Sequence, residues 1–179
     1  LFTNSTGAQL TGLGTQALYN NTTGANNTAV GMNALYTNST AGDSVAVGKD
    51  ALKLNQTGYG NTAIGTYSLD ANTTGYYNNA LGKEALGANT TGIRNDAFGT
   101  YSLRYNETGN YNVAFGYSAL EANTGSNNTA VGYKALEANT TGGANVAIGY
   151  SALDANSTGA NGTAVGYNAL TGVTTGNNN

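Results

Sequence analysis

The sequence predicts an all-β fold, a β-roll-like parallel β-solenoid of about ten 17-residue coils, from three observations. A glycine recurs every 17 residues, with one step of 16 between Gly116 and Gly132. A leucine follows each glycine by four residues, and a short apolar segment precedes almost every glycine. A fixed period of this length is typical of stacked units rather than of one globular core. The glycines are Gly14, Gly31, Gly48, Gly65, Gly82, Gly99, Gly116, Gly132, Gly149 and Gly166.

One repeat array fills the whole chain, residues 1–179. The repeats are regular over residues 27–170 and degenerate over residues 1–26 and 171–179. The chain begins in the middle of a repeat, because its first six residues closely match residues 35–40. We therefore interpret the sequence as a segment of a longer protein or as a matured subunit.

The first segment of each repeat is predicted to be a short β-strand. It begins at Thr28, Val45 and Thr62 in three successive copies and reads Thr-Ala-Val, Val-Ala-Val and Thr-Ala-Ile. Thr, Val and Ile favour the pleated surface of a sheet. The glycine that follows allows a bend or a close approach of two backbones.

The second segment, such as residues 150–155 with the sequence Tyr-Ser-Ala-Leu-Asp-Ala, has two interpretations. It is either a second short strand or one helical turn, since Ala, Leu and Glu are good helix formers. We favour the strand, because a single turn has little intrinsic helical stability.

The third segment is a loop with the sequence Asn-Thr-Thr-Gly or a close variant of it. Asn and Gly tolerate the positive φ angles that tight turns require. The one deletion in the array shortens this loop to residues 123–125 and leaves the flanking segments intact. A loop that loses a residue without disturbing its neighbours is predicted to lie on the outside of the coil.

Both residues that precede the glycine are apolar in nearly every copy, although neighbouring residues of a strand point to opposite faces. One face can form the interior of the coil, and the other must then be nearly dry. A single coil offers only a few small apolar side chains to offset the entropy lost when about 17 residues become ordered. We therefore expect several chains to pack together and bury the second apolar face, as a homo-oligomer.

The asparagine that opens each loop has three interpretations: a turn residue, a member of an asparagine ladder, or a glycan attachment site. In a ladder, the side-chain amides hydrogen-bond from one coil to the next, as in cross-β structures. We favour the turn or the ladder over dense glycosylation, in which the neighbouring Thr residues are further candidates. Nine of these loop asparagines satisfy Asn-x-Ser/Thr: Asn4, Asn21, Asn38, Asn55, Asn72, Asn89, Asn106, Asn139 and Asn156.

Two other columns of side chains follow from the period. Glu121, Glu137 and Asp154 share one phase of the repeat. They indicate either a solvated face close to Lys134, which we favour, or a cation such as Ca²⁺ bound by clustered oxygen ligands. Tyrosines also share a phase late in the chain and are predicted to stack between coils, or to present rings to sugars or to a partner chain. These tyrosines are Tyr117, Tyr133, Tyr150 and Tyr167.

Composition argues against several function classes. The chain contains no Cys, His, Pro or Trp and carries a net charge of −3. Without His or Cys, a Ser-His or Cys-His nucleophile system cannot form and the usual zinc ligands are missing. We therefore expect no enzyme activity, metal or cofactor. The charge provides no basic surface for nucleic acid, and no apolar run approaches the ~18 residues of a membrane span.

The segment that ends in Ala-Val-Gly, together with the glycine-closed loop, resembles the head repeats of trimeric autotransporter adhesins of the YadA type. It also resembles repeats of phage tail fibres. The resemblance covers residues 27–168, and the unit here is about three residues longer. In the adhesin heads, the repeats wind into a left-handed β-roll and three chains form a trimer. The resemblance therefore implies a trimeric, extracellular fibre on a cell or virion surface.

We interpret the chain as a non-enzymatic structural segment of an extracellular fibre, self-assembling as a trimer or end to end as a filament. The alternative is a module that binds surface glycans or ice through its repetitive face. A Thr column suited to ice is interrupted, for example at Val45 and Asp96. A thermal-hysteresis assay tests that alternative.

Overall fold

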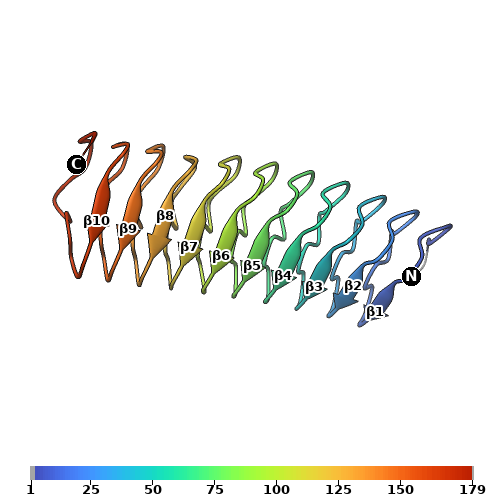
Figure 1. Cartoon of the computed structure of the whole chain (residues 1–179). Coiled ribbons are helices and arrows are strands. Elements are labelled where there is room, and N and C mark those ends of the chain that lie inside the picture. Colours follow the sequence, from blue (N-terminus) through green and yellow to red (C-terminus); the bar gives the residue numbers. More distant parts are fainter. Residues whose placement is uncertain (1–2, 179) are drawn as a thin grey trace.

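The computed structural model describes residues 3–178; residues 1, 2 and 179, at the degenerate ends of the predicted array, lie outside the described part. The described chain forms one stack of coils with ten short strands along one side (Figure 1). Each strand has three residues, and the strands pair in parallel in sequence order from β1 to β10. This confirms the predicted parallel β-solenoid. The strands are β1 Thr11–Leu13, β2 Thr28–Val30, β3 Val45–Val47, β4 Thr62–Ile64, β5 Asn79–Leu81, β6 Asp96–Phe98, β7 Val113–Phe115, β8 Thr129–Val131, β9 Val146–Ile148 and β10 Thr163–Val165.

The 17-residue period sets the register of the sheet. Ala29 in β2 pairs with Ala46 in β3, and the same residue pairing continues along the stack. The 16-residue step does not disturb the sheet, because Ala114 in β7 still pairs with Ala130 in β8. The shortened loop accommodates the change with a single exposed residue, Thr124, at its tip, as predicted.

The core is a narrow column of small side chains inside the coils. The middle residue of each strand from β2 onward is an alanine that points inward and is almost fully buried. The leucine four residues after each glycine lies beside it in every coil but the last, for example Leu35 and Leu52, which have no exposed surface. Strand alternation therefore turns the first and third strand residues outward.

The second segment is neither of the predicted elements. Residues 150–155 form turns, and the described chain contains no helix and no second strand in each coil. Ser151 and Leu153 have φ angles of 48° and 51°, in the left-handed region. These angles bend the chain so that Ala152 and Leu153 are both buried, which an extended strand would place on opposite faces. The Leu153 amide donates to the Ala169 carbonyl of the next coil at 2.9 Å, while the Asn156 amide donates within the coil to the Leu153 carbonyl at 3.1 Å.

The glycine after each strand is required by its backbone conformation and, after β1 to β9, also by the lack of space for a side chain. Gly116 has a φ of 144°, which side-chain-bearing residues rarely adopt. A Cβ atom on Gly116 would lie 2.3 Å from the Gly132 carbonyl oxygen of the next coil. The coils can approach to strand spacing only because this position has no side chain.

Candidate functional site

The outward face of the sheet carries a continuous apolar column. The third residue of every strand is apolar in all ten coils, and several of these side chains are largely exposed. Phe115 is 58% exposed and Ile148 is 41% exposed, far more than a core residue. We call this set the outward apolar column. Its members are Leu13, Val30, Val47, Ile64, Leu81, Phe98, Phe115, Val131, Ile148 and Val165.

The first residue of each strand forms a second outward column beside it. Most members are Thr or Val, and Asp96 is the one charged residue in the two columns. Asn79 donates to the Asp96 carboxylate at 2.7 Å, so even this charge has a partner on the face. The outward face is therefore nearly uncharged from β1 to β10.

The predicted tyrosine column is confirmed. The rings of Tyr117, Tyr133, Tyr150 and Tyr167 stack with centroid separations of 5.4, 5.0 and 5.2 Å and interplanar angles of 11°, 12° and 20°. Because the ring faces are turned toward one another, mainly the ring edges of Tyr133 and Tyr150 reach solvent, whereas Tyr167 at the end of the column is 75% exposed. This arrangement supports cohesion between coils rather than stacking of sugar rings on open tyrosine faces.

The asparagine at the start of each loop forms the predicted ladder inside the coils. Asn72 donates to Asn55 Oδ1 at 2.8 Å and to the Gly75 carbonyl at 3.0 Å, and it accepts from Asn89 Nδ2 at 2.8 Å. The same pattern runs from Asn4 to Asn156. Asn21 and the later members are almost fully buried. A buried amide that donates twice and accepts once satisfies its main hydrogen-bonding needs in the core.

A second ladder, which sequence reasoning missed, lies just before the strands. Asn95 Oδ1 accepts from the Asn112 backbone amide at 3.0 Å, and Asn95 Nδ2 donates to the Gly109 carbonyl at 2.8 Å. That carbonyl also accepts from Asn106 Nδ2 of the first ladder at 3.0 Å, so the two ladders meet there. The Asn that immediately precedes most strands was the signal that could have revealed it. Its buried members are Asn27, Ser44, Asn61, Asn78, Asn95, Asn112, Asn128 and Asn145.

The nine predicted glycan sites occupy the first ladder. Asn4 is exposed, and the other eight are at most 1% exposed. In those eight, Nδ2 already donates to the neighbouring asparagine and to a loop carbonyl, for example in Asn89. A glycan on such a nitrogen would remove one of its two donated bonds and place a sugar in the buried ladder. Glycosylation stays a prediction, which the intact mass of the chain tests.

The three aligned carboxylates lie along one side of the coils. Glu137 pairs with Lys134 at 3.0 Å, and Glu121 lies 3.7 Å from Arg104. Over residues 3–178, no three carboxylates, Glu121, Glu137 and Asp154 included, gather into a group that could hold a metal ion. These pairs support the interpretation of this surface as a solvated, ion-paired face.

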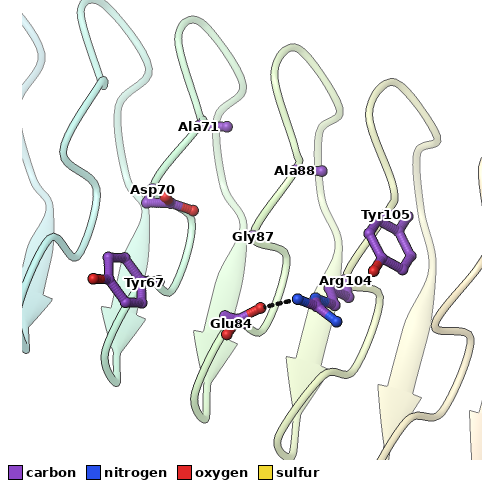
Figure 2. A pocket seen from close by; sticks show the side chains of 8 residues that line it. All are labelled: Tyr67, Asp70, Ala71, Glu84, Gly87, Ala88, Arg104 and Tyr105. Carbon is purple, nitrogen blue, oxygen red and sulfur yellow. Dashed lines mark ion pairs between the residues drawn. The ribbon is translucent and has the colours of Figure 1, made fainter.

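A notch opens on this same side, at Gly87 (Figure 2). Its volume is about 280 Å³. Three coils contribute side chains, and Arg104 forms an ion pair with Glu84 across one side of the notch. The carboxyl group of Asp70 lies at the opposite side. The lining residues are Tyr67, Asp70, Ala71, Glu84, Gly87, Ala88, Arg104 and Tyr105.

Asp70 is the most perturbed acid described. Partial burial raises the pKa of its carboxyl group to about 6, with Asp50 and Glu84 adding repulsion. Lys53 acts in the opposite direction but does not form an ion pair with it. The folded chain therefore favours the protonated form of Asp70 more than the unfolded chain does, although the carboxylate still predominates at pH 7.

This shift predicts a pH-dependent gain in stability for Asp70→Asn. A raised pKa means that Asp70 supports folding most at low pH, and that this support is lost as the pH rises from about 4 through about 6. We expect Asp70→Asn to be more stable than the wild type by about 1 kcal/mol at pH 7.5, a value reduced for solvent contact. At pH 3.5 the two should differ little. Urea unfolding followed by circular dichroism at both pH values measures this, and an equal difference at both would contradict the assignment.

The fold and these surfaces define a repeat protein, a single-chain parallel β-solenoid. No protein-family model, curated protein or solved structure matches the sequence. Within the described part of the chain, no helix is long and apolar enough to cross a membrane.

Proposed function

We propose that this chain is a non-enzymatic structural segment of an extracellular fibre of the adhesin-head or tail-fibre kind, in which copies of the chain pack side by side through the outward face of the sheet. The outward apolar column is the observation that carries the proposal. Large contiguous apolar surfaces are rare on monomeric soluble proteins and mark interaction sites. Here the column runs over all ten strands.

The period of the column favours a second copy as its partner. Apolar side chains recur on this face at the strand spacing of about 4.8 Å. A second solenoid presents the same spacing, so each coil can meet an equivalent coil and the match extends along the whole stack. A globular partner would match only a few coils. The lack of charge on the face, apart from Asp96, removes the main electrostatic obstacle to burying it.

Side-by-side packing also adds buried apolar area, of which a single stack has little. The interior of each coil is mostly alanine and one leucine, which gives a modest hydrophobic gain for the residues that must be ordered. Burial of side chains such as Phe115 and Ile148 between chains adds apolar area. The result is a stiff rod whose length is set by the number of coils.

A charge in the outward apolar column, near its C-terminal end, tests this proposal. We expect Ile148→Lys to lower the particle mass measured by light scattering, because a lysine ammonium would be desolvated at each chain contact. Ile148 already faces solvent in the single chain, so the circular dichroism spectrum should stay unchanged. Thr141→Lys, on an exposed loop tip, is the matched control and should keep the wild-type mass. Equal masses for both variants and the wild type would count against packing through this face.

Binding of ice or glycans through the repetitive face remains the alternative, but no feature of the structure favours it over assembly. The Thr column is interrupted, and the tyrosine rings of the C-terminal half cover one another.

A further inference from the structure

The notch at Gly87 arises because one side chain is missing from a stacked column. The residue after the recurring leucine of each repeat lies on this side of the coils, and Asp70, Gly87 and Arg104 are three successive members. Two coil spacings, about 9.6 Å, separate the coils of Asp70 and Arg104. Every other coil has a side chain at this position, so Gly87 leaves a slot about one coil thick. The other members are Tyr19, Tyr36, Lys53, Glu121, Glu137, Asp154 and Thr171.

The backbone does not require a glycine at position 87. Gly87 has no positive φ angle, unlike the glycines that follow the strands. A Cβ atom placed on it would lie 3.3 Å from the Glu84 carbonyl oxygen and 3.6 Å from Asp70 Oδ1. The first contact is tight and the second is an ordinary van der Waals contact, so a side chain at position 87 would not clash. The second distance also shows that the Asp70 carboxylate borders the space that a side chain at position 87 would occupy.

The Asp70 carboxylate has no ion-pair partner in the described part of the chain, whereas the charged side chains around it are paired. On one side, Asp50 pairs with Lys49 at 3.0 Å and lies 3.6 Å from Lys53. On the other side, Glu84 pairs with Arg104. No ion pair to Asp70 occurs within residues 3–178. A partly buried carboxylate left in this state is best stabilised by a positive charge placed close to it.

The aromatic walls of the notch suit a cation as well. Lys49 Nζ lies 4.3 Å from the centroid of the Tyr67 ring, and Arg104 Cζ lies 5.0 Å from the centroid of the Tyr105 ring. Both distances fall within the range of cation–π attraction. The chain itself thus holds cations beside the same two rings that border the notch.

We propose that the notch at Gly87 binds a single guanidinium or ammonium group, which enters the slot and pairs with the Asp70 carboxylate between the Tyr67 and Tyr105 rings. The ligand takes the place of the lysine or arginine side chain that position 87 lacks. Arg104 does not compete for Asp70, because Glu84 and Glu121 already flank its guanidinium group. This inference is independent of the fibre proposal, since the notch lies outside the sheet face.

Methylguanidinium, methylammonium and the neutral control glucose are the probes for a titration followed by NMR of the Gly87 amide. We expect saturable shifts with both cations and none with glucose. Because the Asp70 carboxyl group has a pKa of about 6, binding at pH 5 should be about tenfold weaker than at pH 7. Glucosamine and an arginine-containing tripeptide then distinguish an amino sugar from a protein side chain as the source of the cation. No saturable shift, equal binding of glucose, or pH-independent binding would overturn the proposal.

Three variants complete the test. Asp70→Asn should reduce binding at least tenfold, and Gly87→Lys should abolish it by placing an ammonium group in the slot from within the chain. Gly87→Lys should also raise the urea midpoint at pH 7, which separates a filled site from a misfolded one. Glu137→Gln, in the ion pair with Lys134 outside the notch, is the matched control with unchanged affinity. Wild-type affinity in both Asp70→Asn and Gly87→Lys would contradict the site.

Discussion

Gly116→Ala is expected to break the stack at the contact between β7 and β8. The new Cβ atom would lie 2.3 Å from the Gly132 carbonyl oxygen and 2.6 Å from its carbonyl carbon, and neither backbone atom can move without separating the coils. A φ of 144° adds strain of about 1–3 kcal/mol for a residue with a side chain. We expect a total loss of more than about 4 kcal/mol in the free energy of unfolding, measured by urea titration.

Gly166→Ala is the matched control for this prediction. Gly166 occupies the same position in its coil and has a φ of 129°, but a Cβ atom there would meet only Ala169 Cβ, at 4.0 Å. Its cost should therefore be limited to the backbone strain. Equal losses for the two variants would show that conformation alone, rather than contact between coils, requires these glycines.

Asn72→Ala is expected to cost about 3 kcal/mol of the free energy of unfolding. The change removes two donated bonds and one accepted bond, of 2.8, 3.0 and 2.8 Å. It leaves Asn55 Oδ1 without its ladder donor and Asn89 Nδ2 without its ladder acceptor, and each buried polar group without a partner costs about 1–3 kcal/mol. The Gly75 carbonyl keeps a bond from Asn61 at 2.8 Å, which limits the loss.

Asn4→Ala supplies the comparison, because Asn4 belongs to the same ladder but is exposed. We expect its cost to stay within about 0.5 kcal/mol, as for most surface changes. Hydrogen exchange should show increased opening of the coils around position 72 in the buried variant alone. A small loss for Asn72→Ala would mean that the ladder fills space without stabilising the core.

The period alone determined the architecture and the register of the sheet. Parallel strands in a solenoid pair residues one repeat apart, so the 17-residue step specified the pairing of Ala29 with Ala46. The first asparagine ladder was also predictable, because an asparagine at the same position of every repeat is unlike the variable residues of an ordinary loop. The residue pattern of the repeat therefore sufficed to predict those features in which equivalent residues of neighbouring coils contact one another.

Local propensity failed where contacts between coils determine the conformation. Leu153 has a φ of 51°, which a leucine rarely adopts on its own, and its burial in the column of leucines outweighs that preference. The sequence also did not show which of the two apolar strand residues faces inward. The structure turns Ala147 inward and leaves Ile148 41% exposed. The notch at Gly87 depends on turn geometry, which no strand or helix pattern describes.

The particle mass of this chain in solution tests the central claim most directly. Light scattering, with the intact chain mass measured alongside, should give a particle of several 18.0 kDa chains. Three chains would agree with the resemblance to the adhesin heads, and the mass should fall in Ile148→Lys. A particle that stays at one chain across the accessible concentration range would contradict side-by-side packing and leave the outward apolar column without its proposed partner.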